Sequence, residues 1–191
     1  MFRVISHVDV YTAGMLALFV IALVPLLPTE VALIGMGVAA AQQEWSLVPV
    51  VLVAAAGCLL SDQFLYTLAR HGGPSVVDRL GNRRGVRTGL DWLTRQSESH
   101  ARPMLIIARW LPSGGTVGAL LAGSLRWPPR TFLTASAIGV TLWSGYTALL
   151  GYLGGQLVQE PGLSLLLSLG VALLLGAIIS LALRARMGTP A

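Results

Sequence analysis

Apolar residues come in five long stretches, which are separated by three short polar segments and one longer, arginine-rich segment. A helix needs about 20 apolar residues to cross the hydrocarbon core of a bilayer. The stretches cover residues 12–41, 46–69, 103–125, 131–158 and 162–183. We expect helices over all five. The last carries no charge before Arg184 and is typical of a simple membrane-spanning helix.

Prolines interrupt the first and the third stretch near their middles. Pro25 and Pro28 lie in the first, and Pro112 lies in the third, where Ser113 and two glycines follow it. Proline removes a helical hydrogen-bond donor and clashes with the preceding turn. Lipid tolerates a broken helix only where protein or water covers the free backbone groups. We therefore predict two re-entrant helical hairpins whose tips meet inside the membrane. A signal peptide is disfavoured for the first stretch because its apolar part is too long and contains prolines.

The composition indicates an integral membrane protein. Hydrophobic residues make up 54% of the 191 residues and charged residues only 11%, whereas a soluble domain is about a quarter charged. This excludes a soluble enzyme or DNA-binding domain. All 13 basic residues are arginines and the net charge is +5, which favours an anionic membrane face over nucleic acid as the partner. The single cysteine, Cys58, offers no disulfide and no metal-ligand spacing, so we expect neither metal nor cofactor.

An offset of 82 residues brings similar positions of the two halves together. We predict one membrane domain with two repeats, 12–73 and 103–155, in which a hairpin (12–41 or 103–125) precedes a long helix (46–69 or 131–158). The matched pairs include Trp45 with Trp127, Gly57 with Gly139, and Gly72 with Gly154.

Arginines orient this arrangement in the membrane. The segment from Arg70 to Arg102 carries seven of them against three acidic residues, so the positive-inside rule places loop 70–102 and the C-terminus in the cytoplasm. Residues 74–101 form either a solvated loop or an amphipathic surface helix. The two long repeat helices then run in opposite directions. Inverted repeats with broken helices meeting near the midplane are typical of transporters.

Three charged residues lie within the apolar stretches: Glu30, Asp62 and Arg109. Charge inside a membrane is costly and by default indicates function. We expect Glu30 and Asp62 to bind and release protons. The alternative is a structural ion pair of Arg109 with either carboxylate, holding the hairpins together.

Arg109 also precedes a candidate anion site. If a half-helix starts near Ser113, the free amides of Ser113 and Gly114 and the arginine suit a phosphate group. Arg70 lies at the expected cytoplasmic boundary, where it is either a further phosphate ligand or only a marker of topology.

These motifs, taken in order, resemble the DedA family, also called the VTT or SNARE-associated-domain family, over roughly residues 10–160. No single motif is diagnostic, but their order and spacing are. The motifs are Pro25-Leu-Leu-Pro28-Thr-Glu30; Asp62, Tyr66, Arg70 and Gly73; Arg109-Trp-Leu-Pro112-Ser-Gly-Gly115; and Ile138-Gly139, Trp143, Gly151-Tyr152 and Gly154. Gly115 stands where the family has a second arginine.

The resemblance implies a multi-pass protein of the bacterial inner membrane that transports lipid. The expected substrate is undecaprenyl phosphate or another anionic lipid headgroup, with coupling to protons through the buried carboxylates. The alternatives are a phospholipid scramblase without ion coupling and a non-transporting factor for envelope homeostasis or assembly. The sequence leaves open whether the chain forms a homodimer.

We expect no enzymatic activity. Residues 112–115 are similar to the Pro-Ser-Gly-His of lipid phosphatases, but position 115 is glycine and not the histidine that this chemistry requires. The three histidines of the chain lie outside the apolar stretches, and no pairing of a nucleophile with a base is evident.

Overall fold

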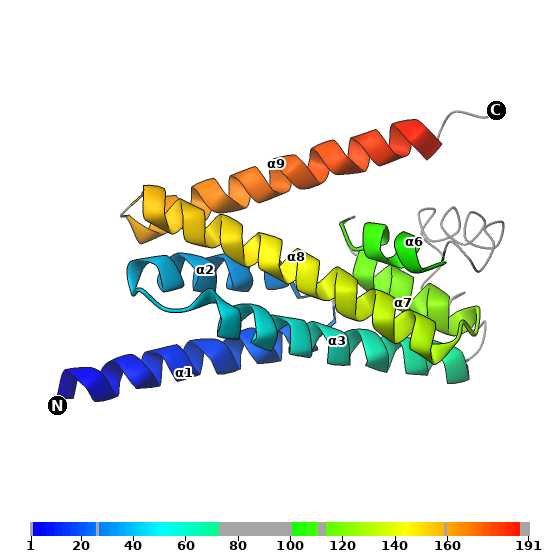
Figure 1. Ribbon diagram of the computed structural model, residues 1–191, viewed down its shortest axis with the longest axis horizontal. Coiled ribbons are helices and arrows are strands. Elements are labelled where there is room, and N and C mark those ends of the chain that lie inside the picture. The colour runs from blue at the N-terminus through cyan, green and yellow to red at the C-terminus, as the bar shows by residue number, and fades with distance from the viewer. Residues whose placement is uncertain (1, 26, 73–100, 111–113, 159, 188–191) are drawn as a thin grey trace. The chain divides into compact units, whose positions relative to one another are not determined.

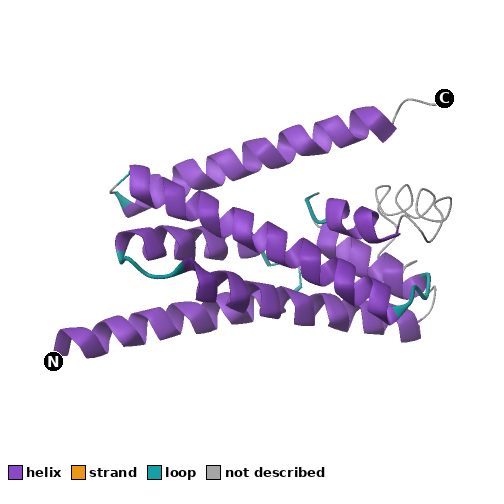
Figure 2. Ribbon diagram, in the orientation of Figure 1, coloured by secondary structure: helices purple, strands orange, loops and turns teal. Residues whose placement is uncertain are grey.

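The computed structural model of the protein describes residues 2–25, 27–72, 101–110, 114–158 and 160–187. Every regular element in these ranges is an α-helix, as predicted (Figures 1 and 2). The helices are α1 Phe2–Leu23, α2 Thr29–Gln42, α3 Leu47–Gly72, α6 Ala101–Ala108, α7 Gly114–Ser124, α8 Pro129–Leu157 and α9 Pro161–Met187. Almost all of the predicted loop 74–101 lies outside the described residues.

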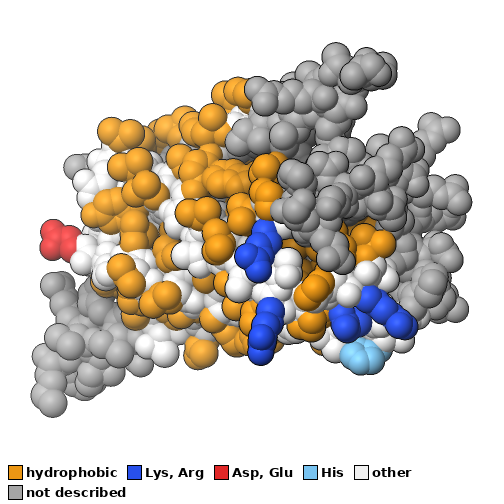
Figure 3. All heavy atoms as spheres, turned by 45° about the vertical axis from the view of Figure 1, so that its right-hand side comes forward, with side chains coloured by type: hydrophobic (Ala, Val, Ile, Leu, Met, Phe, Trp, Pro, Cys, Tyr) orange, Lys and Arg blue, Asp and Glu red, His pale blue; other side chains and the backbone are white. Residues whose placement is uncertain are grey.

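The long helices coincide with the apolar stretches. Within the described residues, α3 and α8 are the two helices long and apolar enough to cross a membrane. Large apolar side chains on α3 project outward at helical spacing and are 46–63% exposed. They are Val48, Leu52, Leu60, Phe64 and Leu68. Hydrophobic side chains also cover most of the described surface in the view of Figure 3. Such a surface suits lipid, because exposed contiguous apolar area is rare on soluble monomers.

Helix breaks occur where the prolines predict them. α1 ends at Leu23 and α2 begins at Thr29, and the two helices pack against each other. α6 ends at Ala108 and α7 begins at Gly114, and this pair is also in contact. Each pair is therefore a helical hairpin, while the re-entrant path through the membrane stays a prediction. The first hairpin is longer than expected because α1 begins at Phe2 instead of near residue 12.

The chain divides into two compact units. Unit 1 comprises Met1–Cys58 and Thr141–Ala191, and unit 2 comprises Leu59–Val140. The division falls within α3 and within α8, so each unit contains one hairpin and part of both long helices. Neither unit coincides with one of the predicted sequence repeats, whose boundaries stay a prediction.

In unit 1, α2 packs closely on α8 through glycines. A Cβ atom on Gly37 would lie 2.4 Å from the Ala148 carbonyl oxygen, and one on Gly151 would lie 2.3 Å from that of Ile34. Such distances exclude any side chain, so the two backbones touch. α2 also packs against α9. The apolar core of this unit consists of Met15, Leu18, Leu33, Val50, Ala54 and Ala148.

In unit 2, α7 also packs closely on a long helix, α3, through a glycine. A Cβ atom on Gly123 would lie 2.3 Å from the Tyr66 carbonyl oxygen and 3.1 Å from the Arg70 amide nitrogen. The apolar core of this unit consists of Leu65, Tyr66, Ala119, Ala122, Trp127 and Phe132.

The turns after α2 and α7 have the same geometry. Glu44 and Arg126 both adopt positive φ, at 55° and 54°, and lie 82 residues apart. The amide of the following tryptophan donates to a carbonyl five residues back in each turn, at 2.9 Å for Trp45 and 3.0 Å for Trp127. This is the Schellman pattern, in which a left-handed residue closes the helix. Both hairpins therefore end in the same way, as a duplicated element would.

Candidate functional site

An ion pair joins two of the predicted intramembrane charges. The Arg109 Nη1 donates to Asp62 Oδ2. Asp62 lies on α3, and Arg109 lies in the turn that follows α6. Both side chains are nearly buried, at 11% exposed for the arginine and 8% for the aspartate. Removal of either partner would leave a buried charge uncompensated, which costs several kcal/mol.

A hydroxyl from a third helix completes the contact. Ser136 of α8 donates to Asp62 Oδ2 at 2.5 Å and is itself buried. One carboxylate oxygen therefore accepts from both the guanidinium and the serine. All three residues belong to unit 2, so the site lies within one compact body.

Glycines surround the Arg109 side chain. A Cβ atom on Gly115 would lie 2.9 Å from Nη1 and 3.3 Å from Cζ of this arginine. A Cβ atom on Gly139 of α8 would lie 3.6 Å from Cδ of the arginine, an ordinary van der Waals distance. The guanidinium thus rests directly on the first turn of α7, where Gly115 is the second residue.

A small cavity borders the ion pair. Its volume is about 10 Å³, and its polar lining comes from Asp62, Arg109, Ser136 and the start of α7 at Gly114 and Gly115. Leu105, Ala119 and Phe132 supply apolar walls. A space of this size holds about one water molecule. A phosphate group does not fit while Arg109 remains on Asp62.

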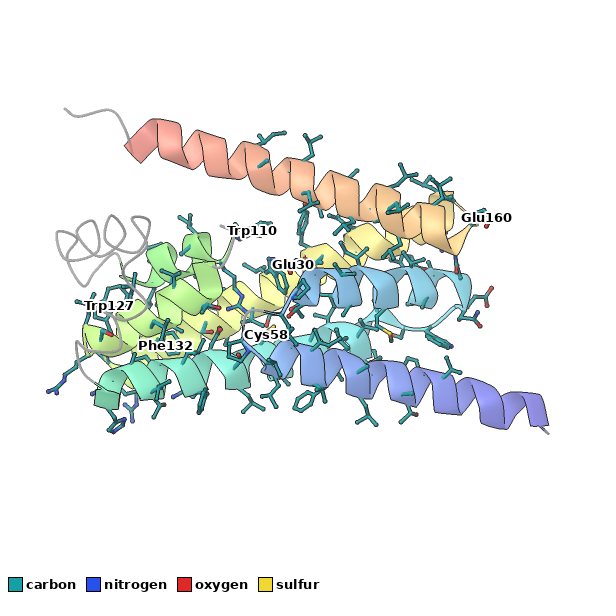
Figure 4. The ribbon with its side chains drawn as sticks, turned by 180° about the vertical axis from the view of Figure 1, so that it is seen from behind. Glu30, Cys58, Trp110, Trp127, Phe132 and Glu160 are labelled. Atoms are coloured by element: carbon teal, nitrogen blue, oxygen red, sulfur yellow. The ribbon has the colours of Figure 1, made fainter. Side chains whose placement is uncertain are left out.

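Arg70 makes hydrogen bonds in another part of unit 2. Its Nη1 donates to the Tyr66 hydroxyl at 2.7 Å and to the Trp127 carbonyl at 2.9 Å, and the Tyr66 hydroxyl donates to the same carbonyl at 2.6 Å. The Tyr66 ring stacks on Phe132 with centroids 4.5 Å apart. Trp127 and Phe132 lie close together near the start of α8 in Figure 4. These contacts fix the turn between α7 and α8, and the phosphate-binding role of Arg70 stays a prediction.

Glu30 differs from Asp62 in its surroundings. It lies in the first turn of α2, in unit 1 (Figure 4), and its side chain is exposed. Within the described residues its carboxylate makes neither a hydrogen bond nor an ion pair. Pro28 caps this helix without a side-chain hydrogen bond, and Thr29 Oγ1 donates to the Leu27 carbonyl at 3.3 Å. The structure therefore pairs Arg109 with Asp62, which was one of the two alternatives that the sequence left open.

The other predicted site residues lie at the breaks. Pro25 and Pro28 lie between α1 and α2, and Gly114 begins α7. Pro112 and Ser113 lie outside the described residues. Sequence reasoning missed Ser136, because α8 carries several serines and threonines and only the packed structure shows which of them faces the ion pair.

The described part of the chain contains no group of three histidine, cysteine or acidic residues that could hold a metal ion.

Comparisons with known proteins agree with the geometry of a small helical membrane protein. A family model described as the VTT domain matches residues 27–153. The inner membrane protein YohD of Escherichia coli is 29% identical over 128 residues, which are 67% of this chain and 65% of that protein. The uncharacterized membrane protein ML0287 of Mycobacterium leprae is 31% identical over 137 residues, covering 70% and 60% of the two chains.

A further relative, the uncharacterized membrane protein Mb2670 of Mycobacterium bovis, is 27% identical over 139 residues, with 70% of this chain and 64% of that protein covered. The chain thus spans slightly less than two thirds of the length of these relatives. No solved structure matches.

Proposed function

The chain belongs to the VTT-domain, or DedA, family of membrane proteins, and we propose that it moves the anionic headgroup of a lipid across the inner membrane. The observation that carries this proposal is the buried contact of Arg109 with Asp62 at the start of α7. The expected substrate is undecaprenyl phosphate or another lipid with a phosphate headgroup. The apolar tail stays in the bilayer, which already solvates it.

Movement of the headgroup is the costly step, because an isolated ion in a low-dielectric medium is strongly penalised. The site offers two positive features, the Arg109 guanidinium and the N-terminal end of α7, which carries a partial positive charge. A lipid phosphate needs such donors to replace its water. Asp62 is the internal anion that now neutralises them.

Asp62 and the phosphate therefore compete for the same positive site. When Asp62 is charged, it holds Arg109 and the cavity has room for about one water. When Asp62 takes up a proton, its attraction for the guanidinium weakens, and the uncompensated positive charge favours an external anion. Such an exchange couples lipid binding to a proton. Glu30 is the second proposed proton carrier, at the hairpin break of unit 1.

We further propose that the hairpins α1–α2 and α6–α7 are re-entrant, and that residues 70–102 and the C-terminus face the cytoplasm. The excess of arginines from Arg70 to Arg102 supports this orientation. In this arrangement inverted repeats let one site face each side of the membrane in turn.

Reconstitution tests the function directly. Translocation of undecaprenyl phosphate is measured in liposomes that contain the purified parent, Arg109→Ala, Arg109→Lys or the control Arg102→Ala, whose arginine is exposed. We expect no translocation with Arg109→Ala. Arg109→Lys should restore part of it, because lysine keeps the charge but loses the bidentate fork. Arg102→Ala should match the parent.

Three results would reject the proposal. Translocation by Arg109→Ala at the parent's rate would place the site elsewhere. Absence of translocation by the parent, for undecaprenyl phosphate and for anionic phospholipids alike, would favour the non-transporting assembly factor. Equal translocation of neutral and anionic phospholipids would favour a scramblase without headgroup selection.

A further inference from the structure

Gly115 lies in the first turn of α7, directly beside the Arg109 side chain. A Cβ atom there would lie 2.9 Å from Nη1, 3.3 Å from Cζ and 3.7 Å from Nη2 of the arginine. The first distance is shorter than real contacts of a Cβ atom. The whole guanidinium group therefore lies against the glycine.

The backbone does not explain a glycine at this position. Gly115 is a helical residue without the positive φ that would exclude a side chain. Glycine within a helix is less favourable than alanine by up to about 1 kcal/mol. The three nearest atoms that a Cβ atom at 115 would meet belong to Arg109. Arg109 is thus the neighbour that a side chain at 115 would displace in this chain.

We propose that Gly115 is a positioning residue: its missing side chain provides the space in which Arg109 reaches Asp62. A methyl group at 115 pushes the guanidinium away from α7. Arg109 cannot give way freely, since the buried carboxylate of Asp62 holds its Nη1. The displacement is therefore taken by the ion pair. This inference concerns how the pair is built and does not depend on what the protein transports.

A double-mutant cycle separates this role from a general need for glycine. Thermal unfolding of the full chain in detergent is measured for Gly115→Ala in the parent and in a charge-free background, Asp62→Ala/Arg109→Ala. In the parent we expect Gly115→Ala to lower Tm by roughly 2–10 °C, the range for overpacking a protein of this size. In the charge-free background the methyl group meets no guanidinium. The substitution should there leave Tm unchanged or raise it, because alanine favours the helix.

Gly118→Ala is the matched control on the same helix. A Cβ atom on Gly118 would lie 3.2 Å from Leu105 Cδ2 and does not meet Arg109. Its effect on Tm should be the same in both backgrounds. If the charge-free background does not fold, Asp62→Asn/Arg109→Met replaces it, since methionine is unbranched and fills the space of the arginine stem.

The proposal is overturned if Gly115→Ala lowers Tm equally in both backgrounds, because the backbone and not the arginine would then require glycine. It is also overturned if Gly115→Ala leaves Tm of the parent unchanged, because the guanidinium would then not depend on the space at 115. A change of sign or a loss of the effect between the backgrounds supports it.

Discussion

The two compact units are built from the same parts but differ in what their hairpin breaks hold. Each contains a helical hairpin and a section of both α3 and α8, and in each the second hairpin helix touches a long helix through a glycine. In unit 2 the break places Arg109 on Asp62 within a packed interior. In unit 1 the break places an exposed Glu30 at the start of α2. Two units with similar parts thus differ in the charged residues at their hairpin breaks.

The 82-residue offset shows where the chemistry differs. Asp62 corresponds to Ser144, and Ser136 corresponds to Ala54. Ser144 is fully buried, and its hydroxyl has no hydrogen-bond partner among the described residues. Ala54 lies in the apolar core of unit 1. At this offset the two turns have the same geometry, while the acid and its hydroxyl partner occur in one half of the chain only.

The largest expected effect comes from separating the charges of unit 2. Asp62→Ala or Arg109→Ala should each lower the free energy of unfolding by about 3–5 kcal/mol, because the remaining charge stays buried. Glu30→Ala should change it little, since the exposed Glu30 side chain loses no ion pair within the described residues. The measurement is reversible unfolding in detergent. If Asp62→Ala and Glu30→Ala lowered the free energy of unfolding equally, the proposed difference between a buried ion pair in unit 2 and an exposed acid in unit 1 would be wrong.

Substitution at the close helix contacts should affect both units alike. Gly123→Ala in unit 2 and Gly37→Ala in unit 1 each bring a methyl group within 2.4 Å of a carbonyl oxygen. We expect each to cost roughly 1–3 kcal/mol of stability, measured by thermal unfolding. Gly145→Ala is the control, because a Cβ atom there meets nothing within 4 Å, and it should be neutral or stabilising. A loss in only one unit would show that the scaffolds are not equivalent.

Ser136 and Ser144 are both buried, but their substitution by alanine should have different effects on stability. Ser136→Ala removes a hydrogen bond to a charged carboxylate and should cost about 1.5–3 kcal/mol. Ser144→Ala removes a hydroxyl that has no partner among the described residues, so it should be neutral or slightly stabilising. Chemical unfolding of both variants measures the difference. If Ser144→Ala proves as costly as Ser136→Ala, the serine of unit 1 also holds a polar partner.

The smallest effect is expected at the matched turns. Glu44→Gly and Arg126→Gly relieve the same left-handed backbone conformation, and each should stabilise by at most about 1 kcal/mol, because the unfolded chain also gains freedom. Differential scanning calorimetry of both variants checks this. Opposite signs for the two variants would contradict the shared turn geometry.

The helices are well predicted from the sequence, because the length of each apolar stretch and the positions of the prolines largely determine where a membrane helix begins and ends. The breaks at Pro25 and Pro28 and the ends of α3 and α8 lie within a few residues of expectation. The extension of α1 to Phe2 was missed, since helices continue cooperatively into sequence of mixed polarity.

The site was predictable only in part. Rare charges in apolar stretches identify Asp62 and Arg109 as candidates, but the choice between Asp62 and Glu30 as the partner depends on packing. The roles of Ser136 and Gly115 depend on which helix faces lie together, and neither residue type is unusual in a membrane helix.

The most direct test of the account is translocation of undecaprenyl phosphate across proteoliposomes with and without a pH gradient. The parent should respond to the gradient, and Asp62→Asn, whose amide cannot carry a proton, should lose that response while still folding. Glu30→Gln, measured beside it, reports whether the exposed acid of unit 1 contributes to the same coupling. A gradient response that survives in Asp62→Asn, or that is absent from the parent, would contradict the proposed exchange of Arg109 between Asp62 and a lipid phosphate.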